Sequence, residues 1–300
     1  MSIKATPLGH SRILSVGTYR PKRAVPNSEI VDRIESTDEW IQQRTGIESR
    51  RFAGDDETVI SMAKAACEMA LKRAKLSIED IDTVILSTIS YPFQAPSAAT
   101  ELINELGNPK AAAFDISAAC AGFCYGVAMA SDLVRSGTSR NVLVIGVEKL
   151  SDYTDPDDRA TAFIFADGAG AVIIGQSDQP RIGQTIWGSD ADSRDAITLT
   201  PSFLDYKKNP EKGVGELGWP NISQQGQVVF RWAVYQMSKA GLKALEVAGV
   251  SVDELGAFIP HQANIRIIET MAKEMKIPDS VLIADDIRTN GNTSAASIPL

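Results

Sequence analysis

The sequence predicts a layered α/β protein, in which buried strands alternate with amphipathic helices. Three observations favour this class. Short apolar runs rich in β-branched residues recur along the chain, stretches with helical periodicity lie between them, and one further stretch is hydrophobic almost all round. With 300 residues, 44% hydrophobic and 23% charged, the chain has the composition of a globular protein and is long enough for two halves.

Five runs fit strands that are buried on both faces, because each is apolar on successive residues and bounded by Gly, Pro, Asp or Ser. They span residues 13–16, 83–89, 142–147, 171–174 and 257–259. Residues 56–75 and 230–247 carry apolar side chains at helical spacing, which predicts two amphipathic helices.

Two further segments differ from this pattern. Residues 120–134 read CAGFCYGVAMASDLV, and a helix this apolar predicts a central element sandwiched between two sheets. Residues 198–227 are rich in Pro, Gly, Lys, Asp and Asn, so we expect a surface loop there. The run AVIIG gives way to the turn-like SDQP, and we place the boundary between the halves 1–178 and 179–300 at this point.

Charge and composition argue against several classes of function. The 38 Asp and Glu exceed the 30 Lys and Arg, giving a net charge of −8, whereas nucleic-acid-binding domains are usually basic. Three cysteines do not make a disulfide framework and fit a reducing compartment. No run approaches the ~18 apolar residues of a membrane span, and no signal-peptide core is present. We therefore expect a cytoplasmic protein that binds neither nucleic acid nor membrane.

Cys120 is the first candidate for chemistry. It opens the predicted apolar helix, where the positive end of the helix dipole favours a thiolate, and its Ala and Gly neighbours leave room for a ligand. The alternative is a small buried hydrophobe, the role that we assign to Cys67 and Cys124. The C-x3-C spacing of Cys120 and Cys124 does not fit a metal or redox pair.

His261 and Asn292 are the other candidates. His261 follows the apolar run GAFIP, at the predicted end of a strand, where open α/β sheets often carry site residues. Asn292, in RTNGNTSAASIP, presents an amide that can donate toward developing negative charge. Both could instead serve turns, and His10 is expected at the surface. Together, Cys, His and Asn can hold an acyl group as a thioester while a second thioester loses CO2, a chemistry that needs no metal or redox cofactor.

Five segments together resemble β-ketoacyl-[acyl-carrier-protein] synthase III, the initiating condensing enzyme of bacterial type II fatty-acid synthesis, in the thiolase-like superfamily. They are TDEWIQQRTGIESRR, DISAACAGF, DRATAFIFADGAGAVIIG, HQANIRII and GNTSAASIP. The resemblance covers essentially the whole chain and is greatest to the actinobacterial branch. It implies a five-layered αβαβα thiolase fold of two similar halves, a homodimer, and two substrates, acyl-CoA and malonyl-[acyl-carrier-protein]. Coenzyme A would enter as a substrate, not as a cofactor.

The resemblance also implies individual roles. Cys120 would accept the acyl group, and His261 and Asn292 would support decarboxylation. Stacking and charge suit the contacts implied for coenzyme A, which are Trp40, Arg44, Arg159 and Asn264. The carrier protein is acidic, and the docking positions implied for it are Arg231, Gln262, Ala263, Arg266 and Lys273. The alternatives are a Trp packed on its own fold and ordinary solvated helix charges.

Two features depart from the family pattern. Ala95 stands where many acetyl-CoA-specific members carry a bulky aromatic, so we expect an acyl pocket for longer or branched primers, unless Phe93 or Tyr91 refills the space. The chain ends at Leu300, whereas members typically continue for a few tens of residues that include an oxyanion-hole loop. We therefore expect the C-terminal half to lack its last elements, and a protein ending at Leu300 to be poorly soluble or inactive.

Two other functions stay open at this point. One is a starter-unit synthase or acyltransferase of secondary metabolism, and the other is a non-catalytic protein that dimerises or docks a carrier. The presence of both His261 and Asn292 favours condensation, because simple acyl transfer does not need a decarboxylation pair.

Overall fold

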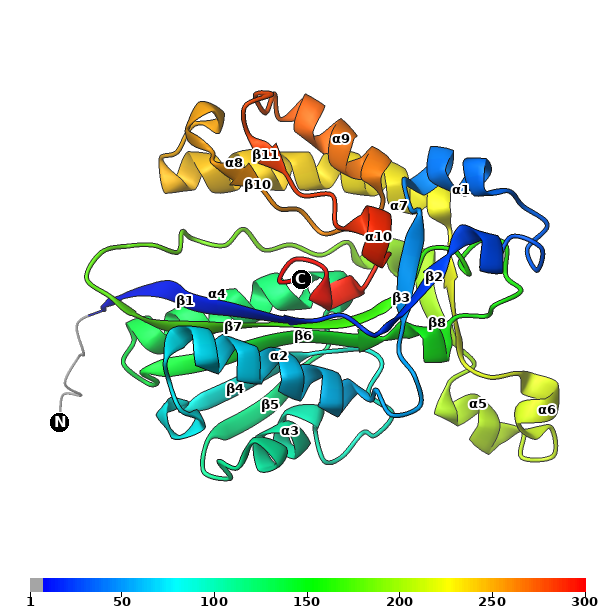
Figure 1. The fold of residues 1–300 in the computed structure, drawn as a ribbon, viewed down its shortest axis with the longest axis horizontal. Helices are drawn as coiled ribbons and strands as arrows, with labels where there is room; N and C mark the ends of the chain where they lie inside the picture. Colours follow the sequence, from blue (N-terminus) through cyan, green and yellow to red (C-terminus); the bar gives the residue numbers. More distant parts are fainter. Residues whose placement is uncertain (1–7) are drawn as a thin grey trace.

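A five-stranded mixed sheet forms the centre of the structure (Figure 1). The computed structural model describes residues 8–300, and the strands run in the order β1–β7–β6–β4–β5. Their bounds are β1 His10–Tyr19, β4 Thr83–Ser87, β5 Ala112–Ile116, β6 Asn141–Lys149 and β7 Asp167–Ser177. β4 lies parallel to β5 and β6, while β7 is antiparallel to β6 and β1. The four apolar runs predicted as strands in this half all lie in the sheet.

The two faces of this sheet bury alternate residues of the same strands. Along β6, Leu143, Ile145 and Val147 pack into one core, while Val142 and Val144 pack into another. This alternation follows from the two-residue period of a strand. Helices α2 (Val59–Ala74) and α3 (Ala98–Leu106) cover the first face, and α4 (Gly122–Arg135) covers the second.

Local chemistry fixes where α2 begins and how closely it packs. The Thr58 hydroxyl accepts from Ser61 N, and Ser61 Oγ accepts from Thr58 N, which is a capping box. A Cβ at Gly17 would lie 2.1 Å from Ala66 O, so only glycine lets α2 rest this closely on β1.

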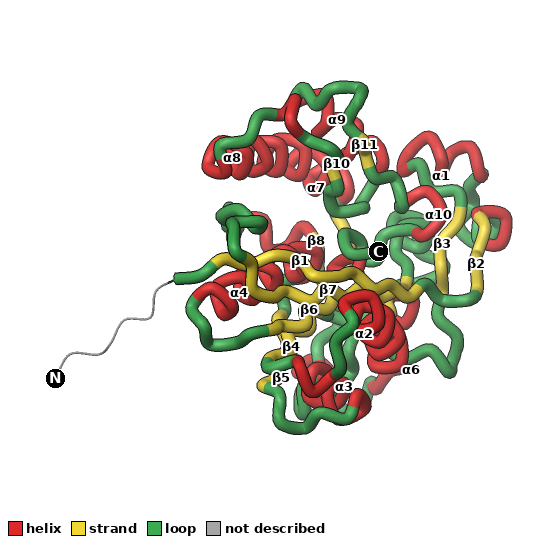
Figure 2. Tube along the Cα trace, turned by 60° about the vertical axis from the view of Figure 1, so that its left-hand side comes forward, coloured by secondary structure: helices red, strands yellow, loops and turns green. Residues whose placement is uncertain are grey.

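A second group of elements lies beyond α4 (Figure 2). It comprises α7 (Gly226–Trp232), a π-helical turn (Ala233–Met237), α8 (Ser238–Ala248), α9 (Ile265–Glu274), and a small parallel sheet of β10 (Ala257–Phe258) and β11 (Leu282–Ile283). Val234, Ile267 and Met271 form its buried core. The second sheet therefore has two strands where the central sheet has five.

Another hydrophobic core joins the beginning of the chain to its end. It is formed around β2 (Arg23–Pro26), α1 (Asp38–Thr45), β3 (Ser49–Phe52), α9 and α10 (Ile287–Asn290). Ile41 and Ile47 from the first part are buried with Ile265, Ile268 and Ile287 from the last. This core holds α9 and the segment after α10 in place over the carboxyl end of the central sheet.

The expectation of a plain loop at residues 198–227 is wrong. The region holds β8 (Ile197–Thr200), α5 (Phe203–Lys208), α6 (Gly213–Leu217) and β9 (Asn221–Gln224), with β8 antiparallel to β9. These elements are short, and several of their large apolar side chains are exposed, Phe203 by 65%. The sequence therefore shows no continuous buried stripe there.

The expectation that the helix at 120–134 is buried all round is also wrong. Phe123, Ala130 and Val134 of α4 are buried against the sheet, but Cys124 is exposed on another face. Cys124 therefore does not belong to the core, whereas Cys67 on α2 is fully buried, as expected.

β1 is only partly buried because it is an edge strand. No helix within residues 8–300 has the length and apolarity needed to cross a bilayer.

Candidate active site

One deep cleft brings the three candidate residues together. It lies between α4 and the end of the central sheet on one side and α7, α8 and α9 on the other, and Cys120, His261 and Asn292 all line it. Its volume of about 2780 Å³ exceeds the ~300–1,000 Å³ of most small-ligand sites, so it can admit a long ligand.

Cys120 sits on a tight turn that leads into α4. The turn is a short 3-10 helix, Ala119–Ala121, and Ala119 has the left-handed φ of +44°, which is strained for a residue with a Cβ. A Cβ at Gly122 would lie 1.8 Å from Ser87 Oγ, so glycine allows the turn to rest on the end of β4. As predicted, the thiol lies at the N-terminal end of the helix.

His261 faces Cys120 from the other side of the cleft. Its Nδ1 lies 2.6 Å from Ser297 Oγ, which also accepts a hydrogen bond from Gln262 N. The side chains of His261 and Ser294 lie close enough to Cys120 to act on its sulfur. The serine at 297 thus orients the imidazole toward the sulfur.

The charges of this pair shift both pKa values. Burial alone would raise the pKa of the Cys120 thiol, but the charge of His261 and the hydrogen bonds from His261 and Ser294 lower it to about 7. Burial would lower the pKa of His261, yet the Cys120 charge and hydrogen bond raise it overall. The pair therefore favours a thiolate beside an imidazolium near neutral pH.

Asn292 is held by its backbone and by one side-chain oxygen. Its N donates to Ile164 O and its O accepts from Ala166 N, both at 2.9 Å. Asn292 Oδ1 accepts from Ser294 N at 2.9 Å, and within residues 8–300 this is its only side-chain hydrogen bond. The amide Nδ2 is therefore the group of Asn292 that remains to donate to a ligand.

The residues expected to contact coenzyme A also lie together in this cleft. The guanidinium carbons of Arg44 and Arg159 lie 5.4 and 5.5 Å from the centre of the Trp40 ring, which packs edge-on against Phe163. Asn264 caps α9 by accepting from Arg266 N, and its Nδ2 donates to Arg44 O at 3.0 Å. An aromatic ring between two cations is suited to stack with a planar, anionic ligand.

The residues expected to dock a carrier protein divide into two groups. Arg231 on α7 and Arg266 on α9 are exposed and line the cleft with Ala263, whereas Lys273 is exposed farther along α9. Gln262 is only 1% exposed. Its Nε2 donates to the backbone oxygens of Pro260 and Ala284. The expectation that the Gln262 side chain faces a docked carrier protein therefore does not fit its buried position.

The two residues assigned to the acyl pocket differ in position. Phe93 is 62% exposed and lines the cleft, while Ala95 is exposed but does not line it in the single chain. His10 is exposed, as expected.

Sequence reasoning missed Ser294 and Ser297, although both stand in GNTSAASIP beside Asn292. A motif shows which residues recur together but not which hydroxyl reaches which side chain. Across residues 8–300, no group of three or more His, Cys, Asp or Glu side chains is arranged to hold a metal ion.

Comparisons with known proteins identify the family. The family model of 3-oxoacyl-[acyl-carrier-protein (ACP)] synthase III matches residues 114–191, and that of its C-terminal part matches residues 245–300. The chain is 52% identical over 296 residues to β-ketoacyl-[acyl-carrier-protein] synthase III 1 of Streptomyces coelicolor, covering 97% of this chain and 86% of the relative. The chain belongs to the β-ketoacyl-[acyl-carrier-protein] synthase III family.

Other relatives agree with this family. The synthase III of Kocuria rhizophila is 49% identical, with 98% of this chain and 88% of the relative covered. The priming β-ketosynthase of the R1128 polyketide pathway superimposes with a TM-score of 0.96 at 42% identity, covering all of this chain and 88% of that one. The predicted actinobacterial resemblance and thiolase-like fold are confirmed, and the relatives extend beyond the matched region.

The charge pair of Cys120 and His261 predicts a specific pH dependence. Alkylation of Cys120 by iodoacetamide should become rapid as the pH rises through about 7, because the thiolate reacts and the thiol does not. In His261→Ala, the sulfur stays buried but loses its cation, so this rise should move above the ordinary Cys pKa of ~8.5. Peptide mass spectrometry would follow Cys120 apart from Cys124. His10→Ala, the only other histidine substitution available, should leave the profile unchanged. A midpoint still near 7 in His261→Ala would contradict the charge pair.

Proposed function

We propose that the protein condenses a primer acyl-CoA with malonyl-[acyl-carrier-protein], giving 3-oxoacyl-[acyl-carrier-protein], CO2 and CoA, and so initiates fatty-acid synthesis. The observation that carries this proposal is the Cys120 thiol, with a pKa of about 7, hydrogen-bonded to His261 in a cleft that Asn292 also lines. Coenzyme A is part of a substrate in this reaction, and the residues need no metal or redox cofactor.

In the first half-reaction the Cys120 thiolate attacks the carbonyl carbon of the acyl-CoA. A C–S bond to Cys120 forms, the C–S bond to coenzyme A breaks, and the leaving thiolate takes the proton that His261 held. The backbone N–H of Cys120 lies in the turn just before α4 and would donate to the developing oxyanion near the positive end of the helix dipole. The products are acyl-Cys120, free CoA and neutral His261.

In the second half-reaction the malonyl thioester loses CO2. His261 Nε2 and Asn292 Nδ2 donate to the thioester oxygen and stabilise the enolate that forms. Its carbon attacks the acyl-Cys120 carbonyl, so a C–C bond forms and the C–S bond to Cys120 breaks. The thiolate of Cys120 is regenerated, and His261 takes up a proton from solvent to replace the one that left with coenzyme A, which closes the cycle.

The contacts expected for the two substrates extend this proposal. Trp40, Arg44 and Arg159 would hold the adenine end of coenzyme A, with Asn264 fixing Arg44 through its backbone. Arg231, Ala263, Arg266 and Lys273 would meet the acidic carrier protein, whereas the buried Gln262 would support them from beneath. The halves 1–178 and 179–300 would supply Cys120 and the His261–Asn292 pair respectively, and the last strand of the central sheet ends at Ser177.

A second candidate function is the priming of polyketide chains. It is favoured by the TM-score of 0.96 to the R1128 priming β-ketosynthase. The chemistry is the same, and the primer differs. Ala95 in place of an aromatic residue supports a pocket for primers longer or more branched than acetyl.

The two half-reactions predict separable mutant phenotypes. Asn292→Ala should still form acyl-Cys120 but lose condensation and CO2 release by ~10²–10³-fold, since it removes one oxyanion donor. Intact-protein mass spectrometry with acetyl-, isobutyryl- and octanoyl-CoA, followed by CO2 release from malonyl-carrier protein, would measure both. Cys120→Ser is the control without an acyl adduct. Condensation at the wild-type rate by Asn292→Ala would refute the role of Asn292 as an oxyanion donor. In the same acylation experiment, strict preference of the wild type for acetyl-CoA would refute an acyl pocket that admits longer or branched primers.

Docking of the carrier predicts an effect confined to one substrate. Lys273 is exposed and outside the cleft, so Lys273→Glu should raise the KM for malonyl-carrier protein severalfold at low salt and leave acylation by acyl-CoA unchanged. The effect should shrink at high salt because exposed charges are screened. Lys72→Glu, on α2 across the central sheet, is the matched control. Equal effects of the two substitutions would place the docking surface elsewhere.

We further infer a cytoplasmic homodimer that pairs through β5. This strand bonds to β4 on one side, and its other edge has no strand partner within residues 8–300. The segment with Phe93 and Ala95 follows β4, the strand next to β5, so a partner chain there would reach the cleft region. Light scattering at micromolar concentration should give twice the mass of one chain, and a monomer would contradict the dimer.

A further inference from the structure

A buried glutamate lies beneath the cleft at the end of β6. Glu148 is fully buried, and one of its oxygens, Oε2, accepts three hydrogen bonds. The donors are Ser90 Oγ at 2.6 Å, Ile89 N at 3.1 Å and Thr88 Oγ1 at 3.2 Å. All three belong to one segment, the one that leaves the carboxyl end of β4.

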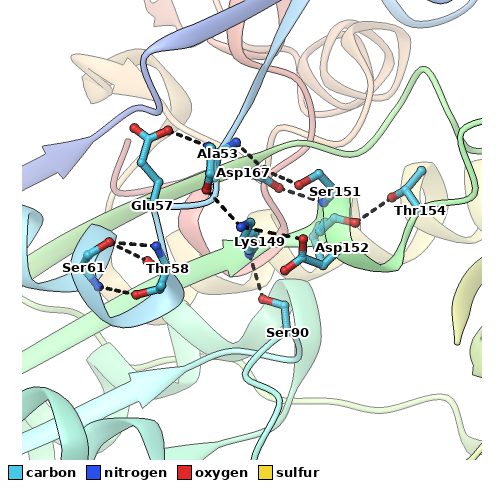
Figure 3. Close-up of polar contacts among 12 residues, drawn as sticks. Ala53, Glu57, Thr58, Ser61, Ser90, Lys149, Ser151, Asp152, Thr154 and Asp167 are labelled. Atoms are coloured by element: carbon cyan, nitrogen blue, oxygen red, sulfur yellow. Dashed lines mark hydrogen bonds and ion pairs between the residues drawn. The ribbon is translucent and has the colours of Figure 1, made fainter. Parts of the chain in front are cut away.

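The same segment is tied back to β6 a second time. Ser90 Oγ accepts from Lys149 N at 2.8 Å, and Thr88 Oγ1 accepts from Ser90 N at 3.1 Å (Figure 3 shows the contact of Ser90 with Lys149). Farther along, the Tyr91 hydroxyl donates to Glu101 on α3. The strand end Glu148–Lys149 is therefore the anchor for the first residues after β4.

This anchored segment is part of the wall of the site. Thr88, Ile89, Tyr91 and Phe93 line the same cleft as Cys120. The contact of Ser87 with the Cys120 turn, through Gly122, fixes where the segment starts. Its path after Ser87 then depends on Glu148, because Glu148 accepts from each of the next three residues.

We propose that Glu148 is a positioning residue that sets which acyl groups Cys120 accepts, by holding Thr88–Phe93 at a fixed distance from the sulfur. The proposal rests on the proposed acylation of Cys120. In this proposal neither Glu148 nor Ser90 touches the acyl group, and both act only through the position of the segment. Loosening the anchor lets the segment move away from the sulfur, which widens the pocket and favours longer primers.

A second buried acid supplies a matched control. Asp167, at the start of β7, pairs across the sheet with Lys149, is 1% exposed and also accepts three hydrogen bonds. They come from Ala53 N, Ser151 N and Ser151 Oγ, at 2.6–2.8 Å (Figure 3). Burial raises the pKa of Asp167 to about 6 and that of Glu148 to about 7. Both acids are buried and accept three hydrogen bonds, although Glu148 Oε1 has no partner within the described residues, and Asp167 bonds nothing in Thr88–Phe93.

The test compares the rates of Cys120 acylation by octanoyl-CoA and acetyl-CoA, read by intact-protein mass spectrometry. Their ratio within one sample does not depend on how much of the protein is folded. Glu148→Ala and the milder Ser90→Ala should raise the ratio about fivefold, the effect of losing roughly one net hydrogen bond. Glu148→Gln, which keeps a carbonyl acceptor, should stay near wild type, and Asp167→Ala should leave the ratio unchanged.

Hydrogen exchange separates the possible failures. Amide exchange in Thr88–Phe93 should rise in Glu148→Ala and Ser90→Ala but not in Asp167→Ala. Faster exchange with an unchanged ratio in Ser90→Ala would overturn the role in specificity, and so would an equal change of the ratio in Asp167→Ala. Unchanged exchange would overturn the anchor itself. Absence of any acyl adduct on wild-type Cys120 would instead refute the proposed function, and the exchange data would still report on the anchor.

Discussion

The charge pair between Cys120 and His261 is the interaction on which the reactivity of the site depends. A thiol buried without a cation is inert, because desolvation raises its pKa, as at Cys67, which is fully buried on α2. Cys120 escapes this chiefly because the charge of His261, 141 residues later in the chain, lowers its pKa. Since each member of the pair alone would be driven to its neutral form, the two parts of the chain must be packed together for either to be charged.

That packing is achieved by close backbone contacts at the floor of the cleft. A Cβ at Gly146 of β6 would lie 2.2 Å from Ala295 O, so glycine lets the segment that carries Ser294 and Ser297 rest directly on the central sheet. Gly122 does the same for the Cys120 turn over Ser87. The Gly146 contact is with backbone and leaves no side chain to adjust, while the Gly122 contact is with the short Ser87 side chain, so both place the segments of the site with little freedom.

The sequence predicts the reacting groups better than their surroundings. Cys120, His261 and Asn292 stand in local motifs, and the central strands show as apolar runs, so all of these could be found. The predictions for Cys124 and Gln262 are wrong because neighbours in sequence do not show which side of an apolar helix, or of a turn, faces the solvent. Glu148 escaped notice because it ends an apolar strand, where a charge normally marks the surface, and its partners are 58–60 residues away.

Glu148 also shows how the charge state of the site is limited. The thiolate and imidazolium cancel, so the pair can be buried at modest electrostatic expense, but a nearby carboxylate would add an uncompensated charge. Burial raises the pKa of Glu148 first, and the Cys120 charge raises it further, to about 7. Acylation removes the thiolate, and because His261 gives up its proton in the same half-reaction, the net charge beside Glu148 stays at zero. The hydrogen bonds from Thr88, Ile89 and Ser90 to Glu148 do not depend on contact with the acyl group, so they can hold the segment through both half-reactions.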